Sequence, residues 1–519
     1  MKCNISVERH RKVETHCQTQ RIERICNLES LITMVVSIAS IPIDNELQQA
    51  MLHSSGWLET PELVDDIVSR DLLKLSMRDR NSIQEEIHGV TNHFHEETPE
   101  FLEASLEELS QELNRIPDHD PIKAAYLDSQ VSSNGQTYVY RPDFRLRFLR
   151  CELFDTRKAA RRMLNFLNHA CHLFGPKILE RPIKITDLTK EDQKLLRKGY
   201  IQVLPFRDRS GRPIISWLGD FGVAEGTVQS RHRNSLYLLW TMSEDVESQR
   251  KGATKLIWCI NNFPRTFPKM ENVEYGTRTL NAMPIRISAF HFCVPDHPFF
   301  HIMRSMYALI MQRSNYLFRL QFHVGEEIEL RYKLKTYGMP VESIPVTGSG
   351  SIKTQHLKQW IQKRTSIDEI GSDGGIVECP RSNDVVFRTG KSNMCNPGNA
   401  MFFNLIESRM QEHSAATQLE RSEITKSIIW TIRNSGGRFL GWDNSRSGWI
   451  EIVGMSQIHK KVANRVKAFK SRSTATVQQT LQSSTDVFQT EDNRKRRKLA
   501  AHSYESMDSA EQCFGSCSL

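Results

Sequence analysis

Five side chains between residues 291 and 301 carry donor atoms that transition metals prefer, so a metal site is the first chemistry to consider. His291 and Cys293 stand two residues apart, and Asp296, His297 and His301 follow them. If a helix begins early, His297 and His301 share one face at i, i+4 spacing. The apolar run before them instead favours a strand end whose polar residues cap the next helix, because zinc sites need a tighter ligand pair. We therefore predict no metal site here.

A second pattern suggests phosphate binding but lacks a required residue. Gly390-Lys391-Ser392 follows the strand-like "DVVF", yet Val385 stands where the first glycine of a phosphate-binding loop belongs. The larger part of the chain also offers no nucleophile, base and orienting group that can be placed together. We therefore predict no catalytic residues and a function that is not enzymatic.

The acidic stretch "PEFLEASLEELSQELNRI" has the period of an amphipathic helix, with glutamates on its solvent face. Its apolar residues recur at helical spacing and are Phe101, Leu102, Leu106, Leu109 and Leu113. His88, His93 and His95 precede it at spacings that do not share a helical face, so we interpret them as surface histidines.

Length and charge limit the class of protein. At 519 residues the chain exceeds one core of roughly 250 to 300 residues, so we expect two folded domains. The net charge of +8 favours anionic partners, and eleven scattered cysteines favour a reducing compartment. The apolar run "LITMVVSIASIPI" is shorter than the about 20 residues that span a bilayer. We expect neither secretion nor a transmembrane segment, and a cytoplasmic or nuclear location.

The stretch "VLPFRDRSGRPII" predicts a β-hairpin. Two apolar arms flank a charged turn in which Gly211 can take positive φ and Pro213 stands at a strand start. We expect the charged tip in solvent and the apolar arms inside.

The elements around this hairpin alternate between helix and strand. Helical patterns cover 148–175 and 235–252, strand patterns cover 253–263 and 283–296, and a Met-rich and aromatic helix pattern covers 298–320. "LQFHV" reads as a further strand, and the helix after it ends at Gly338. This alternation predicts an α/β layer beside an all-helical N-terminal lobe.

Four motifs in this order resemble the CRAL-TRIO lipid-binding family over about 100–360. The first three are the "FLR…FD..KA..ML" pattern from Phe148 to Leu164, the Asp-x-x-Gly-Arg-Pro hairpin and the strand, proline and long-helix unit. The fourth is the exit from Tyr337 through Pro340 to Pro345. The resemblance implies a helical lobe at 81–180 and a lipid-binding lobe at 181–365, after a poorly defined region at 1–80.

The resemblance further implies a pocket that encloses one lipid, floored by the sheet and closed by the helix 299–319. No cofactor other than the bound lipid is implied, and contact with a membrane surface would be transient. The implied lipid contacts are Trp258, Phe290, Phe292, Phe299, Phe300, Met303, Met306, Tyr307 and Ile310.

A Gly-rich stretch at 366–383 reads as a linker to a second, small α+β domain at 384–470. This part resembles a domain of unknown function that recurs in unicellular algae. The matching residues include Asp384, the turn from Asn396 to Asn399, Phe402, the run from Gly436 to Leu440 and Trp449. Helix, helix, hairpin and helix follow one another here, which is the order of a winged-helix-like module.

Basic residues concentrate in this second domain. Its thirteen Lys or Arg against seven Asp or Glu give a net charge of +6. The phosphate contacts of a nucleic-acid-binding module would be Lys460, Lys461, Arg465, Lys467 and Lys470. A solvated basic helix on an interaction domain is the alternative.

The tail from 471 onwards is polar and reads as disordered. It contains a compact basic run typical of nuclear import, namely Arg494, Lys495, Arg496, Arg497 and Lys498. Binding, exchange or sensing of a hydrophobic ligand is the leading functional hypothesis, and a nuclear nucleic-acid-binding or regulatory protein is the alternative.

Overall fold

A computed structural model describes the chain in segments. These are residues 69–91, 96–131, 137–218, 226–259, 270–297, 316–340, 344–370, 376–387, 396–444 and 448–470, with residues 300, 304, 307, 308 and 311. The described residues up to Pro397, together with Leu440–Glu451, form one compact unit. Gly398–Phe439 and the described residues from Ile452 onwards form a second. The whole is mixed α/β, with a helical N-terminal region and a small α+β region near the C-terminus.

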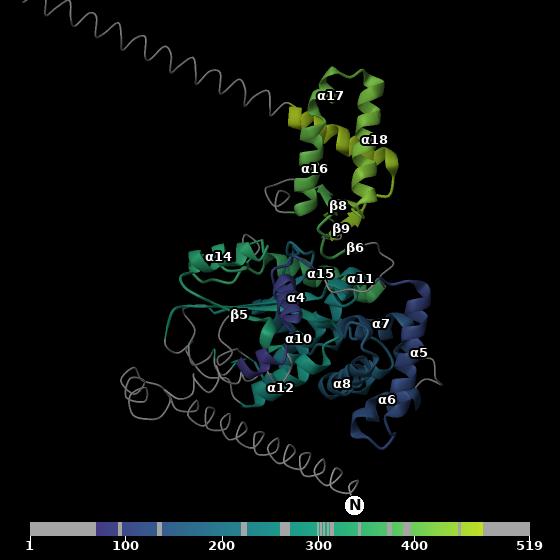
Figure 1. The fold of residues 1–519 in the computed structure, drawn as a ribbon, viewed down its shortest axis with the longest axis vertical. Coiled ribbons are helices and arrows are strands. Elements are labelled where there is room, and N and C mark those ends of the chain that lie inside the picture. The colour runs from purple at the N-terminus through teal and green to yellow at the C-terminus, as the bar shows by residue number, and fades with distance from the viewer. Residues whose placement is uncertain are drawn as a thin grey trace, which may run out of the picture. The chain divides into compact units, whose positions relative to one another are not determined.

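Helices make up the first part of the larger unit (Figure 1). They are α4 (Met77–Ile87), α5 (Pro99–Arg115), α6 (Ala124–Val131), α7 (Pro142–Cys151), α8 (Thr156–Phe174) and α9 (Lys190–Lys198). Short 3-10 turns cover Pro121–Lys123, Tyr138–Tyr140, Pro176–Leu179 and Ile185–Asp187. The predicted acidic helix is confirmed as α5. The predicted N-cap of α8 is also confirmed, because the carboxylate of Asp155 accepts from the amide of Lys158 at 3.0 Å.

Five strands form the central sheet in the order in which they occur in the chain. They are β1 (Ile201–Val203), β2 (Ile214–Leu218), β3 (Ala253–Trp258), β4 (Ile287–Val294) and β5 (Leu320–Val324). Strands β2 to β5 are parallel, and β1 is an antiparallel edge strand. Helices α10 (Val228–Met242), α11 (Val246–Lys251), α12 (Met270–Ala282), α14 (Glu327–Thr336) and α15 (Gln355–Ile370) and the turn Leu317–Arg319 complete this part.

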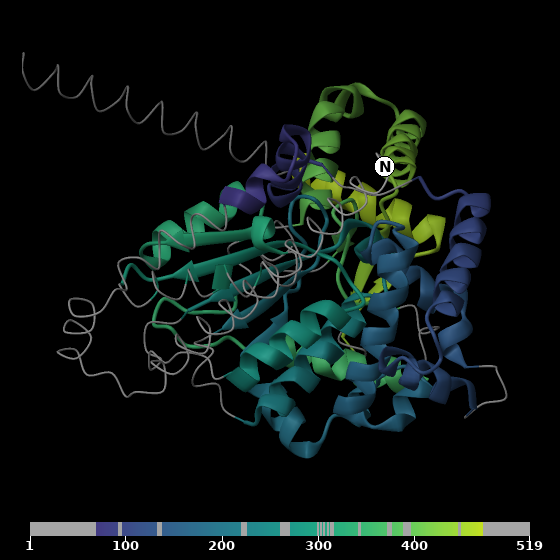
Figure 2. The same cartoon turned by 60° about the horizontal axis from the view of Figure 1, so that its bottom comes forward.

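Helices cover the two faces of this sheet differently (Figures 1 and 2). Helices α8, α10 and α12 share one apolar core with the first face, and α14 packs on the second face. The first core also includes Leu109 of α5 and Phe148 of α7. Residues of both predicted lobes therefore contribute to one continuous interior.

The predicted hairpin is confirmed in its strands and wrong in its tip. Ile201 pairs with Trp217 in the antiparallel register, and Gly211 has φ +83°. Arg209 is exposed, but the charged residues on either side of it are not solvated: the exposed fractions of Asp208 and Arg212 are 1% and 0%. Arg212 Nε donates to Asp208 Oδ2 at 2.6 Å, so the opposite charges neutralise each other inside the protein.

Two predicted element boundaries need correction. The helix predicted at 235–252 is two helices, because Asp245 caps α11 by accepting from the amide of Ser248. The strand predicted over 253–263 ends at Trp258, and the one predicted over 283–296 is Ile287–Val294. Most of the predicted gate helix lies outside the described residues.

A second sheet has the order β6-β9-β8-β7. Its strands are β6 (Ile376–Val377), β7 (Val385–Phe387), β8 (Phe439–Asp443) and β9 (Gly448–Glu451). The predicted tryptophan hairpin is confirmed, since Trp442 lies opposite Trp449 with ring centroids 5.1 Å apart. The stretch predicted as a linker contributes the end of α15 and all of β6, which pairs with β9.

The smaller unit is helical. It contains α16 (Pro397–Ser408) from Gly398 onwards, α17 (Met410–Ala415), α18 (Gln418–Asn434) and a helix over 455–470. The two helices predicted at 398–412 and 419–434 are confirmed, although the first is interrupted at Arg409. Thr417 and Glu420 form a capping box at the start of α18, and Gly436 follows its end with φ +76°.

Candidate functional site

The first face of the five-stranded sheet gathers aromatic side chains from three strands. Side chains alternate between faces along a strand, so Trp217, Phe290 and Phe292, and Phe322 share this face with Lys255. Phe292 lies 5.0 Å from Phe322, measured between ring centroids. Trp217 and Phe322 are partly exposed, although helices pack against this face of the sheet. Phe290 and Phe292 are buried, so among these five side chains partial exposure is confined to Trp217, Lys255 and Phe322.

Side chains from the segment after β4 lie over this face. The ring of Tyr307 lies 4.7 Å from that of Phe292, and the ring of Tyr316 lies 5.2 Å from that of Phe290. Phe300 and Met311 are buried in the same apolar core. These contacts place part of the methionine-rich and aromatic segment against the sheet.

The predicted lipid contacts fall into three groups. Phe290, Phe292, Phe300 and Tyr307 are brought together on the first face. Trp258 is not among them, because it points to the second face and packs in the core with Leu330 and Leu334. The period of two along β3 explains this, since Trp258 and Lys255 lie on opposite faces. Phe299, Met303, Met306 and Ile310 lie outside the described residues.

Lys255 on β3 is a feature that we did not select from the sequence. Its Nζ lies 4.7 Å from the ring centroid of Trp217 and 5.8 Å from that of Phe290. Burial lowers the pKa of the ammonium from 10.5 to about 8, because apolar surroundings solvate the charged form poorly. A single lysine inside the apolar run "ATKLIWCI" was the available signal.

A polar cluster lies between α8, α10 and α12. The hydroxyl of Thr279 is 3.1 Å from His169 Nε2 and 3.1 Å from His232 Nδ1. Burial, together with neighbouring cations, lowers the pKa of His169 to about 4 and that of His232 to about 3. The ring of Tyr275 stacks on His232. Both histidines are neutral at physiological pH, so the cluster offers hydrogen bonds without charge.

The hairpin tip connects two of the motifs that carry the family resemblance. The amide of Arg209 donates to the carbonyl of Gly338 at 2.9 Å. The guanidinium of Arg212 donates to the carbonyls of Glu86 and Ile87 in α4, and Thr254 donates to the carboxylate of Asp208. These charges therefore join the hairpin, β3 and α4, which is a structural role.

Other buried charges are also paired. The carboxylate of Glu86 accepts from Arg286 and Arg319, and its pKa falls to about 2 because the two guanidinium groups outweigh the opposing effect of burial. Arg364 of α15 contacts Glu244 at 2.6 Å and Glu378 at 3.1 Å. The stretch around the predicted linker is thus tied to the end of α10.

Of the residues considered for a metal site, His291, Cys293, Asp296 and His297 are described, and His301 lies outside the described residues. His291 and Cys293 lie on the second face, where His291 Nδ1 is 3.0 Å from His323 Nε2. Both histidines pack against Tyr337, whose ring also stacks on His88. No group of three or more metal-type side chains occurs among the described residues. His88 is half-buried rather than a surface residue, while His93 and His95 lie outside the described residues.

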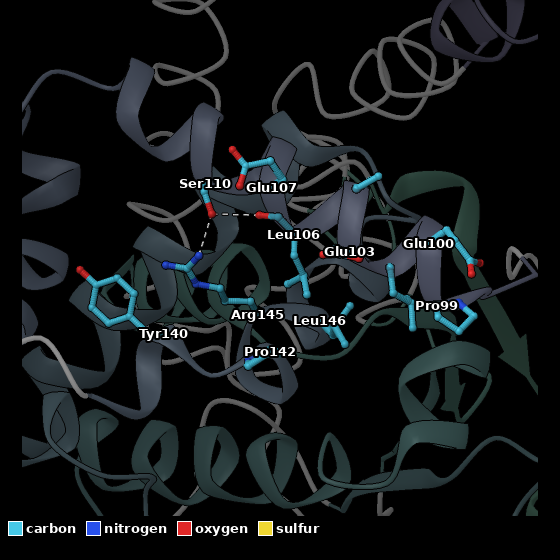
Figure 3. A pocket seen from close by; sticks show the side chains of 12 residues that line it. Pro99, Glu100, Glu103, Leu106, Glu107, Ser110, Tyr140, Pro142, Arg145 and Leu146 are labelled. Atoms are coloured by element: carbon cyan, nitrogen blue, oxygen red, sulfur yellow. Dashed lines mark hydrogen bonds between the residues drawn. The ribbon is translucent and has the colours of Figure 1, made fainter.

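A groove of about 820 Å³ lies between α5 and α7, away from the aromatic face (Figure 3). Leu102, Leu106 and Leu146 line it, and glutamates of α5 stand along its rim. Its deepest cation is satisfied, because Arg145 Nη1 donates to Ser110 Oγ at 2.8 Å. Within this groove, no buried polar atom is left to direct a ligand.

The helix over 455–470 is amphipathic. Ile458, Val462 and Val466 form its buried stripe at i, i+4, i+8 spacing. Of the predicted phosphate contacts, Arg465 is half-buried, and the other four are exposed, namely Lys460, Lys461, Lys467 and Lys470. The predicted import signal, Arg494 to Lys498, lies outside the described residues.

Comparison with known proteins identifies one part of the chain. Residues 384–468 match a family model described as a domain of unknown function, DUF6824. No CRAL-TRIO family model matches the chain, and no curated protein matches it. Among the helices that the structure describes, none combines the length and apolar composition needed to cross a membrane.

Proposed function

We propose that this protein binds, and exchanges or senses, a hydrophobic ligand of lipid size on the first face of its five-stranded sheet. The observation that carries the proposal is the partial exposure of Trp217, Lys255 and Phe322 beside the buried rings of Phe290 and Phe292. Hydrocarbon chains gain about 0.8 kcal/mol for each methylene buried on such a surface.

The sequence order of motifs supports the same proposal. It resembles the CRAL-TRIO lipid-binding family, whose ligand would lie between a sheet and a mobile helix. The methionine-rich and aromatic segment 299–319 supplies flexible thioethers and flat rings, which adapt to a hydrocarbon chain. Loading from a membrane would need only transient contact with its surface.

A binding role without catalysis agrees with the state of the buried thiols and histidines. Burial raises the pKa of the Cys151 thiol to about 11 and holds that of Cys293 well above its ordinary value. Such thiols are poor nucleophiles at neutral pH. The buried histidines of both faces are neutral and hydrogen-bonded.

Lipid extraction tests the proposal directly. We expect mass spectrometry of an organic extract of the purified full chain to find a lipid in near-equal ratio to protein. We also expect transfer of a fluorescent phosphatidylcholine between phosphatidylcholine vesicles. Phe322→Asp places a charge on the aromatic face and should abolish both signals, whereas Tyr332→Asp on exposed helix α14 should change neither. Absence of lipid and of transfer in the unmodified chain would reject the proposal.

A second candidate function rests on the exposed lysines of the helix 455–470. Four cations on the solvent side of one helix could contact the phosphates of a nucleic acid, and each contact would release counterions. The order of elements that suggested a winged-helix-like module remains a prediction. In a gel-shift titration we expect binding to weaken from low to high salt and to weaken uniformly across sequences in Lys460→Ala. Binding with no salt dependence, or none at all, would remove this candidate.

A further inference from the structure

Lys255 occupies a position where a charge is costly. It lies in the middle of β3, a central strand, opposite Ile215 on β2 and Phe290 on β4. Its neighbours on the same face of β3 are Ala253 and Ile257, and both are buried. Transfer of a lysine ammonium into such surroundings is unfavourable unless an anion compensates its charge.

No compensating anion is present in the part of the chain that the structure describes. There, the Lys255 ammonium takes part in no hydrogen bond or ion pair, and its polar neighbourhood consists of the Trp217 and Phe290 ring faces. The nearby titratable group is His232 of α10, which is neutral. The other buried cations described in this unit each donate to a carboxylate or to a neutral oxygen, as Arg212 does to Asp208 and Arg147 does to the Ser243 hydroxyl. Lys255 thus departs from the rule that the rest of the fold follows.

Escape of the side chain into solvent does not explain this position. Lysine often extends its stem along an apolar surface until the ammonium reaches water, and its pKa then stays ordinary. Lys255 is only partly exposed, and its surroundings desolvate it enough to lower its pKa to about 8. The residue is therefore partly exposed while its ammonium is poorly hydrated, which is an environment found at ligand contacts.

We propose that Lys255 holds the anionic head group of an amphiphilic ligand whose hydrocarbon chain contacts the partly exposed ring of Phe322. The inference rests on the proposed function and specifies its ligand class. Carboxylates and phosphates share the required chemistry, since either accepts a charge-assisted hydrogen bond from an ammonium. The Trp217 ring orients the ammonium in the free protein and remains beside it when the anion binds.

Three ligands with closely similar hydrocarbon tails distinguish the contribution of the head group to binding from that of the tail. The full chain is delipidated and titrated by calorimetry at pH 7 with oleate, oleoyl lysophosphatidic acid and oleyl alcohol, each below its aggregation concentration. We expect at least one acid to bind about tenfold or more tightly than the alcohol. Preference for either acid supports the proposal and identifies the head-group chemistry.

Substitution assigns that preference to one side chain. Lys255→Met keeps the length and apolar stem of the side chain, so it should lose the preference for the acid while its affinity for oleyl alcohol stays within about twofold. Lys255→Arg should retain the preference. Lys335→Met removes an exposed lysine from α14, on the second face, and should behave as the unmodified chain.

The outcomes separate the two proposals. Equal binding of acid and alcohol by the unmodified chain would overturn the head-group assignment and leave hydrophobic binding intact. A preference that survives in Lys255→Met would overturn it as well. Binding of none of the three ligands would overturn both proposals. Retained affinity for oleyl alcohol in Lys255→Met shows that the variant is folded.

Discussion

Thr254 and Lys255 are neighbours on β3, but they face two regions with opposite electrostatic organisation. Thr254 points to the hairpin tip, where Asp208 and Arg212 neutralise each other and every charged group has several partners. Lys255 points to the aromatic face and is paired only with ring faces among the described residues. Among the described residues, the buried cations on which the architecture depends donate hydrogen bonds to carboxylates or neutral oxygens, whereas Lys255 donates none. This difference is the basis of the proposal that a ligand contacts Lys255.

Breaking the paired region should have the largest effect. Arg212→Met leaves the Asp208 carboxylate buried with only two neutral donors, the Thr254 hydroxyl and the backbone amide of residue 212, so we expect a loss of about 3–5 kcal/mol in the free energy of unfolding. Chemical denaturation measures this loss. Arg209→Met changes the exposed arginine three residues earlier and should cost less than about 1 kcal/mol. Similar losses in the two variants would contradict the distinction between buried and exposed partners.

The Glu86 carboxylate gives the paired charges a pH signature. Its pKa in the folded protein is about 2, against 4.5 ordinarily, so its stabilising contribution is complete above pH 4.5 and is lost as pH falls towards 2. The shift corresponds to about 3 kcal/mol. We expect Glu86→Gln to be less stable at neutral pH and to lack this part of the acid dependence. Parallel stability curves for the variant and the unmodified chain would contradict the assignment.

Lys255→Met should raise the free energy of unfolding, whereas the two preceding substitutions lower it. The pKa of Lys255 lies near 8 in the folded protein and near 10.5 in the unfolded chain, so charging it destabilises the folded state fully below pH 8. That deficit disappears as pH rises from 8 to above 10.5. We expect the ligand-free variant to be about 1–2 kcal/mol more stable at pH 7, because partial exposure reduces the full effect. The difference should vanish near pH 11, which denaturation at two pH values can check.

Trp217→Leu tests the contact between the Lys255 ammonium and the Trp217 ring, and it should have the smallest effect of these substitutions. Removing the ring takes away a cation–π attraction of about 0.5–2 kcal/mol, so the pKa of Lys255 should fall further, by about 0.4–1.5 units. NMR titration of the lysine side-chain signal measures this change. Trp258→Leu is the matched control, because Trp258 lies on the other face beside Arg331 and its loss should leave Lys255 unchanged.

The sequence predicts the helices and strands better than it predicts which side chains are buried and which face of the sheet each one occupies. Periodicity and capping residues are local, so α5, the cap at Asp155, the β1–β2 hairpin and the helices of the smaller unit could be found without a structure. The burial of Arg212 could not, because it depends on carbonyls of α4 more than 120 residues away. Trp258 was misplaced for a similar reason, since the face it occupies follows from strand register rather than from residue type.

The second sheet has a consequence for how the matched domain can be produced on its own. Strand β9 lies between β6 and β8, but the family match begins at residue 384, after β6 has ended. A fragment cut at the family boundary would therefore leave one backbone edge of β9 open, with the tryptophan hairpin beside it. Open strand edges pair with other chains, so such a fragment should self-associate. A fragment that starts before Ile376 should self-associate less.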